Sequence, residues 1–152
     1  MLSGLPYEKS DMQRKEGYYR SQQPVKNFTF EIDFKVADVE KSIVFYEKAF
    51  GFERKFITPD KDYGELLTGN TSIAFASITL VSATLKQGFT ESSLEQKPFA
   101  IELGLVTDAV AETIQQACNM STDCGEPRKN HGGQTVCLNI RDIDGFSHYE
   151  NL

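Results

Sequence analysis

The chain has 152 residues, of which 39% are hydrophobic and 25% charged, a balance typical of a globular domain. Its net charge of −6 argues against a nucleic-acid partner, and no apolar run is long enough to span a bilayer. Three cysteines without a CxxC pair and no visible secretory signal predict a cytoplasmic protein with reduced thiols, in which Cys118 and Cys124 form no bridge.

Residues 1–27 are polar and show no clear period, which predicts an N-terminal arm outside the core. The arm carries five basic and three acidic groups, a net +2 that leaves −8 on the rest of the chain. The stretch FEIDFKVAD, residues 30–38, alternates apolar and charged residues and so predicts a half-buried strand. Asp38 is a candidate N-cap for the next helix, and Gly51 suits its end. Further strands are expected within 53–57, 63–69 and 72–81.

The second half of the chain repeats this order after a polar linker at 86–97. A shift of 71 positions places Phe30-Glu31-Ile32 on Ile101-Glu102-Leu103. A strand and a helix are expected within 99–117, and strands near 126–129, 134–141 and 146–152. Each half is too small to bury a robust core alone. Two such halves, packed together, are expected to leave a ligand groove between their sheets.

Three segments carry a resemblance to a known superfamily: VADVEKSIVFYEKAFGF (36–52), DYGELLTGNTSIAFAS (62–77) and GGQTVCLNIRDIDGF (132–146). They resemble the vicinal oxygen chelate superfamily of glyoxalase I, bleomycin-resistance proteins and extradiol dioxygenases. The resemblance implies an α+β fold of two βαβββ modules, with mixed curved sheets and helices on their outer face, and a homodimer. It places the arm at 1–27 and one domain at 28–152, made of a module at 28–85, the linker at 86–97 and a module at 98–152.

Metal-dependent members of this superfamily place His, Glu or Gln ligands on the first and last strands of each module. Residue by residue, the resemblance puts the two first-strand positions on Glu31 and Glu102. It puts the last-strand position of the second module on Tyr149, with Glu150 one place later. The remaining position falls within IAFASI (73–78), which offers no ligand. The cofactor expected is therefore either none or a divalent metal held by Glu31, Glu102 and Glu150.

Other side chains are candidates for the groove. Glu31 and Glu102 are the candidate catalytic residues, since one of two nearby carboxylates can act as a general base. Asp33 and Lys35 share a strand face with Glu31 and pair either with each other or with a ligand. A last set of candidates either stacks on an aromatic ligand or packs within the sheets: Tyr63, Phe75 and Tyr149.

Three functions are compatible with these residues. The first is a metal-free binder of a small basic or aromatic molecule in an acidic groove, in the manner of the bleomycin-resistance branch. The second is a divalent-metal lyase, isomerase or dioxygenase of glyoxalase type. The third is a non-catalytic dimerisation module. The expected partners are a small-molecule ligand and a second copy of the chain, without nucleic acid or membrane.

Overall fold

The computed structural model describes residues 30–69, 71–120, 124–129 and 135–151, and only the backbone of residues 127, 135–139, 150 and 151. The expected arm at 1–27 lies outside the described residues. The elements, in chain order, are β1 (Glu31–Val36), α2 (Val39–Phe50), β2 (Glu53–Ile57), β3 (Tyr63–Leu67), β4 (Ser72–Ser77), α3 (Ile78–Ser82), β5 (Glu102–Val106), α4 (Val110–Met120), β6 (Pro127–Lys129), β7 (Thr135–Arg141) and β8 (Ser147–Asn151).

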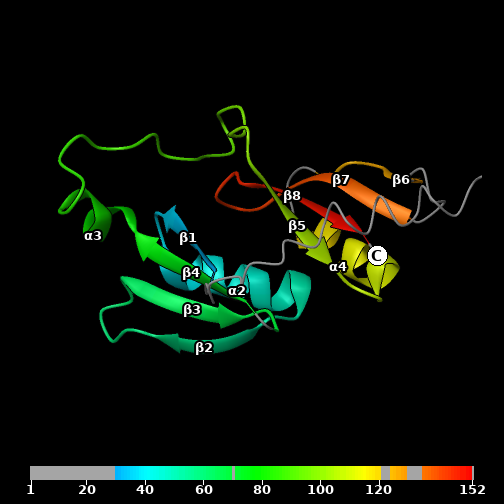
Figure 1. The fold of residues 1–152 in the computed structure, drawn as a ribbon, viewed down its shortest axis with the longest axis horizontal. Helices are drawn as coiled ribbons and strands as arrows, with labels where there is room; N and C mark the ends of the chain where they lie inside the picture. The colour runs from blue at the N-terminus through cyan, green and yellow to red at the C-terminus, as the bar shows by residue number, and fades with distance from the viewer. Residues whose placement is uncertain (1–29, 70, 121–123, 130–134, 152) are drawn as a thin grey trace, which may run out of the picture.

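The strands form two four-stranded sheets of the same topology (Figure 1). Their orders are β1-β4-β3-β2 and β5-β8-β7-β6. In each sheet the strand that comes first in the chain (β1 or β5) runs parallel to the one that comes last (β4 or β8), while the other neighbours are antiparallel. Each module therefore reads strand, helix and three strands, which confirms the expected α+β fold of two βαβββ units. Among the described residues, no helix is long and apolar enough to cross a membrane.

Helix α2 begins and ends where the sequence predicts. The Asp38 side chain accepts a hydrogen bond from the Lys41 backbone N–H at 3.1 Å, which caps the first turn. Gly51 ends the helix in the left-handed region at φ 70°, which costs glycine nothing. The strand expected at 72–81 is shorter, because the Ser77 side chain accepts from the Leu80 N–H and starts α3.

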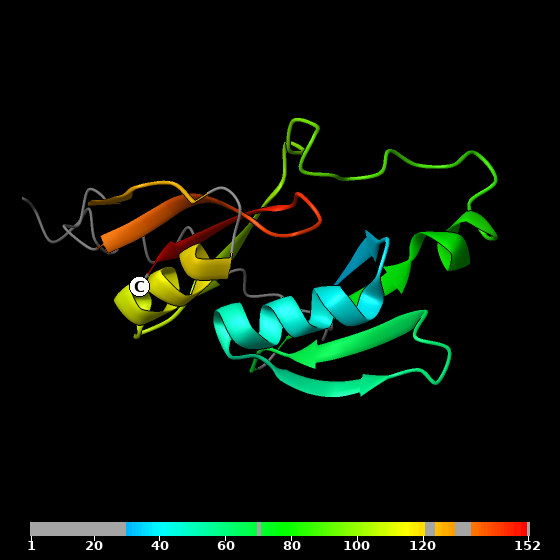
Figure 2. The same ribbon diagram turned by 180° about the vertical axis from the view of Figure 1, so that it is seen from behind.

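The two modules meet through their helices. Helix α2 covers one face of the first sheet, α4 covers one face of the second, and the two helices pack side by side (Figure 2). The buried apolar side chains of both modules form one continuous core. Gly64 in β3 lets helix α2 pack close to the first sheet, since a Cβ added to this glycine would lie 2.5 Å from the Ile43 Cδ1 of α2. Each sheet keeps its other face away from the helices.

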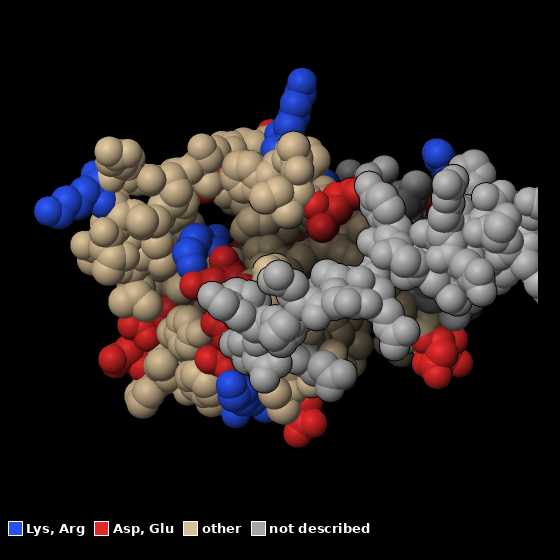
Figure 3. Space-filling model, viewed as in Figure 1, with Lys and Arg blue, Asp and Glu red and all other residues tan. Residues whose placement is uncertain are grey.

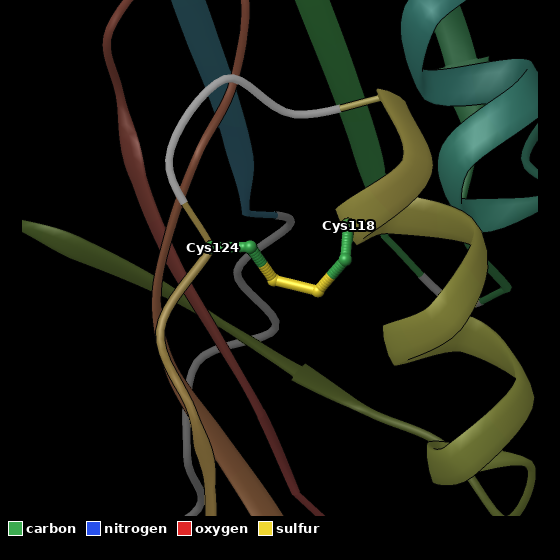
Figure 4. Close-up of a disulfide and its surroundings, with 2 residues drawn as sticks. All are labelled: Cys118 and Cys124. Atoms are coloured by element: carbon green, nitrogen blue, oxygen red, sulfur yellow. A yellow bond between two sulfur atoms is a disulfide. The ribbon is translucent and has the colours of Figure 1, made fainter.

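The expectation of reduced thiols is wrong for two of the three cysteines. Cys118, near the end of α4, forms a disulfide with Cys124, which precedes β6 (Figure 4). Their Cα atoms are 5.4 Å apart, within the range that a disulfide spans. The spacing of six residues fits no familiar cysteine pattern, so only the return of the chain against the helix reveals this pair.

Candidate functional site

The alternation of residues 31–36 places charges on the face of the first sheet that α2 does not cover. Phe34 and Val36 are buried toward the helix, whereas Glu31 and Asp33 are exposed and Lys35 is half-buried. Asp33 and Lys35 form an ion pair, as one of the two sequence alternatives proposed. The strand therefore presents an open polar face and a core face, as its pattern predicts.

Strand β3 extends this polar face. The Tyr63 hydroxyl donates to Glu65 Oε1 at 3.1 Å, and Lys55 Nζ lies 2.5 Å from Glu65 Oε2. Burial and the hydrogen bond to Glu65 raise the pKa of Tyr63 well above its ordinary value, so its hydroxyl keeps its proton to a higher pH than that of a free tyrosine. Glu65 and Lys55 were not singled out from the sequence. The sequence carries little signal for them, because residues 53–65 do not alternate and their charges come in runs at 53–55 and 60–62.

The two modules repeat one pairing across their parallel strands. Glu31 is paired with Ser72 in the first sheet, and Glu102 is paired with Ser147 in the second. The Ser72 hydroxyl donates to the Glu31 carboxylate at 3.1 Å. The offset of 71 residues thus selects two glutamates in the same structural position. Both stand at the start of the first strand of their module.

The next pairs on the same face of these strands, two residues further along, differ between the modules. Asp33 is opposite Ala74 in the first, and Gly104 is opposite Tyr149 in the second. A Cβ added to Gly104 would lie 2.5 Å from the Tyr149 hydroxyl oxygen, so the tyrosine ring rests over the glycine. The Tyr149 ring therefore lies on the same face of the second sheet as Glu102.

A pocket of about 510 Å³ lies between the first strands of the two modules. Most of its lining is apolar and comes from Phe30, Ile32, Phe34, Phe99, Ile101, Leu103 and Phe146. Two acidic residues, Asp33 and Glu102, also line it. Figure 3 shows this side of the molecule hollowed near its centre, with acidic side chains on both sides of the hollow. The pocket thus combines aromatic walls with negative charge, a composition typical of small-molecule sites.

The sequence predictions place some of these lining residues and miss others. Asp33 and Glu102 were expected at a groove, and both line the pocket. Phe99, Ile101 and Phe146 were not singled out, although each flanks a strand of the second module. Their signal is weak, because an apolar residue at the end of a strand is as typical of core packing as of a ligand wall.

Four other candidates lie on the open faces of their sheets but do not line this pocket: Glu31, Lys35, Tyr63 and Tyr149. Two candidates remain, Phe75 and Glu150. The Phe75 side chain is fully buried in the core, where its ring packs against those of Phe34 and Tyr46. It therefore faces α2 rather than the open face that carries Glu31. Glu150 has its backbone in β8, and its side chain lies outside the described residues.

The four positions at which the resemblance implies metal ligands do not offer a sufficient set. Glu31 and Glu102 supply a carboxylate each, but the matching places on the last strands hold Ala74 and Tyr149. An alanine offers no donor atom, and a hard divalent cation takes six or more oxygens or keeps several waters. In the part of the chain that the structure describes, no three His, Cys, Asp or Glu side chains gather to hold a metal. Among the described side chains, the donor set at these positions does not fit a metal held by the protein.

A buried polar cluster links the two modules behind the pocket. The Tyr46 hydroxyl of α2 donates to Asp142 Oδ2 at 2.5 Å and lies 2.9 Å from His148 Nε2, which is itself 3.1 Å from Asp142 Oδ2. All three side chains are fully buried. Asp142 Oδ1 also accepts the backbone N–H groups of Asp144 and Phe146 and so shapes the turn between β7 and β8. Because no part of it reaches solvent, this cluster serves the packing of the modules.

The comparisons with known proteins agree with this architecture. The model of the Glyoxalase/Bleomycin resistance protein/Dioxygenase superfamily matches residues 31–147. No curated protein matches the chain.

Solved structures similar to the chain share its fold at low sequence identity. Lactoylglutathione lyase from Agrobacterium tumefaciens is 16% identical, with a TM-score of 0.61 over 85% of this chain and 95% of that one. A glyoxalase-related enzyme from Fulvimarina pelagi is 15% identical, with a TM-score of 0.65 over 84% and 88%. A glyoxalase/bleomycin resistance protein/dioxygenase family enzyme from Burkholderia phytofirmans PsJN is 18% identical, with a TM-score of 0.63 over 80% and 94%. At these identities the likeness concerns the fold alone.

Proposed function

The chain belongs to the glyoxalase/bleomycin resistance protein/dioxygenase superfamily, and on that basis we propose that it binds a small cationic, aromatic molecule without a protein-held metal. The binding site is the pocket between β1 and β5. The observation that supports this most strongly is its lining, in which aromatic and aliphatic side chains surround the carboxylates of Asp33 and Glu102. Apolar walls bury a ring, while a few placed charges orient it.

The charges of the pocket favour a cation. Lys35 pairs with Asp33 and offsets part of its charge, which leaves Glu102 as the pocket carboxylate without an ion-pair partner among the described residues. Glu102 is exposed, so its attraction to a bound cation is that of a surface pair, up to about 1 kcal/mol. The larger part of the affinity then comes from burying the ligand ring against the phenylalanines.

A metal-dependent reaction of glyoxalase type is less well supported by these residues. Glu31 and Glu102 occupy equivalent positions, but the alanine and tyrosine at the two remaining positions do not complete a ligand set. Elemental analysis of protein purified without chelators tests this alternative directly. A stoichiometric divalent metal, together with a rise in melting temperature on adding Mn²⁺, would favour the metal-dependent function over a metal-free binder.

The proposed function is tested by calorimetric titration of the full chain with tryptamine and with tryptophol. Tryptophol carries a hydroxyl where tryptamine carries its amine, so the pair isolates the contribution of charge. We expect saturable binding of tryptamine and weaker binding of tryptophol. If neither compound, nor benzamidine or proflavine, binds saturably, the proposal is wrong.

Two variants locate the binding. Glu102→Gln should weaken tryptamine binding about threefold, as expected for a surface pair, and leave tryptophol binding unchanged. Glu91→Gln, at an exposed loop position away from the pocket, should alter the binding of neither compound.

Ile101→Ser should weaken the binding of both compounds, because this exposed side chain forms part of the pocket wall. Val106→Ser is its matched control, since Val106 lies in β5, is 74% exposed against 75% for Ile101, and does not line the pocket. Equal effects of the two serine variants would place the site elsewhere.

A further inference from the structure

The pocket runs along the edges of two strands rather than over the face of a sheet. In the orders of the two described sheets, β1 and β5 are end strands, so β1 is paired only with β4 and β5 only with β8. The pocket lies between them. Each strand therefore turns the edge that has no strand partner in these sheets toward the same cavity.

The lining residues support this orientation. Successive side chains of a strand point to opposite faces, so a pocket over one face is lined by every second residue. Here the pocket is lined by four consecutive residues, Ile101 to Gly104, and on the other side by three, Ile32 to Phe34. Residues of both faces border it, which is the arrangement expected where a ligand site meets the backbone edge of a strand.

We propose that the ligand of this pocket is an extended, amide-bearing chain with a cationic group, such as a short basic peptide segment, bound by strand addition to β1 or β5. This inference rests on the proposed function and specifies its ligand class. A strand edge presents backbone N–H and C=O groups with the spacing that another extended chain can pair with. From Phe30 to Phe34 the edge is about 13 Å long at the rise of a strand, enough for four or five residues.

The charges along the two edges decide between a foreign peptide and a second copy of the chain. Asp33 and Glu102 line the pocket, and Glu31 stands on the same strand as Asp33. Pairing of β1 or β5 with the same strand of another copy would bring these carboxylates together, and like charges across paired strands are destabilising. A basic extended chain instead gains from Glu102 and from the part of the Asp33 charge that Lys35 does not offset. A dimer formed through another surface leaves the pocket free for it.

The test is titration of the full chain with a capped pentapeptide that alternates phenylalanine and arginine. Two N-methylated versions of the peptide are compared with it, one modified at the even and one at the odd residues. N-methylation removes a backbone donor and keeps the side chains, and alternate donors of a strand point to opposite edges. We expect saturable binding of the parent peptide and a loss of at least tenfold in affinity for one or both methylated versions. A version with glutamate in place of arginine should not bind.

Other outcomes separate this inference from the function on which it rests. If tryptamine binds and the peptide does not, or if both methylated peptides bind as tightly as the parent, strand addition is wrong while the small-molecule function stands. If neither the peptide nor any of the four small molecules tested above binds, both proposals fail. Sedimentation of the unmodified protein and of its Ile101→Ser variant tests whether a second copy of the chain fills the pocket instead. A dimer that Ile101→Ser dissociates and Val106→Ser does not would make a second copy the occupant and overturn the peptide proposal.

Discussion

Replacing Tyr46 by phenylalanine tests how the two modules are held together. The substitution keeps the ring, which packs in the core against Phe75 and the ring of His148, and removes only the hydroxyl. That hydroxyl donates to Asp142 Oδ2 at 2.5 Å in a site from which solvent is excluded. In the variant, this oxygen of the Asp142 carboxylate keeps His148 as its only side-chain partner among the described residues.

The size of the effect follows from this burial. A hydrogen bond to a charged, buried group contributes about 1.5 to 3 kcal/mol, because no water replaces the lost donor. We therefore expect Tyr46→Phe to lower the free energy of unfolding by about 2 kcal/mol. For a domain of this length that loss corresponds to a fall in melting temperature of about 4 to 8 °C.

Urea unfolding followed by circular dichroism measures this loss, with Tyr63→Phe as the matched control. Tyr63 also donates to a carboxylate, that of Glu65, but it is half-buried and Glu65 keeps Lys55 as a partner. The control should cost less than about 1 kcal/mol. If Tyr46→Phe were as stable as the parent, or if the two variants lost equal stability, the cluster would not hold the modules as described.

Three further predictions concern other parts of the fold. Burial raises the pKa of Asp144 to about 6, so the stability that this carboxyl contributes is full below about pH 4 and is lost as pH rises through 6. Asp144→Asn should therefore abolish up to about 3 kcal/mol of the decline in unfolding free energy over this range. A variant with the same pH profile as the parent would contradict the prediction. Reduction of the Cys118–Cys124 disulfide should cost about 2 kcal/mol in the same assay, and alkylation of both thiols in non-reduced, denatured protein would contradict the bond. Gly64→Ala should destabilise by about 1 to 3 kcal/mol, because its Cβ would overlap Ile43, and an unchanged melting temperature would refute that packing.

Local chemistry made much of this fold predictable. The Asp38 cap and Gly51 bound α2, since each acts through its own backbone and its nearest neighbours. Alternation assigned Glu31 to the open face of its strand, because side-chain direction in a strand has a period of two. The repeat then identified Glu102 as its equivalent, and the paired serines of the two sheets agree with that assignment.

Features that join distant parts of the chain were not predictable in this way. Nothing in the local sequence around Tyr46 marks Asp142 as its partner, 96 residues away, and the bond exists only because α2 packs against the turn before β8. Phe75 fits a ligand wall as well as it fits a core, and the side of the sheet covered by the helix decided between them.

By itself, the sequence determined the two modules, their helix ends and the faces of their strands, because these depend on periodicity and on short-range backbone contacts. Tertiary structure alone decided the disulfide between Cys118 and Cys124, the buried cluster and the position of the pocket. The pocket depends on how far apart the edges of β1 and β5 stand once the helices have packed. That separation is a property of the assembled core and of no single segment.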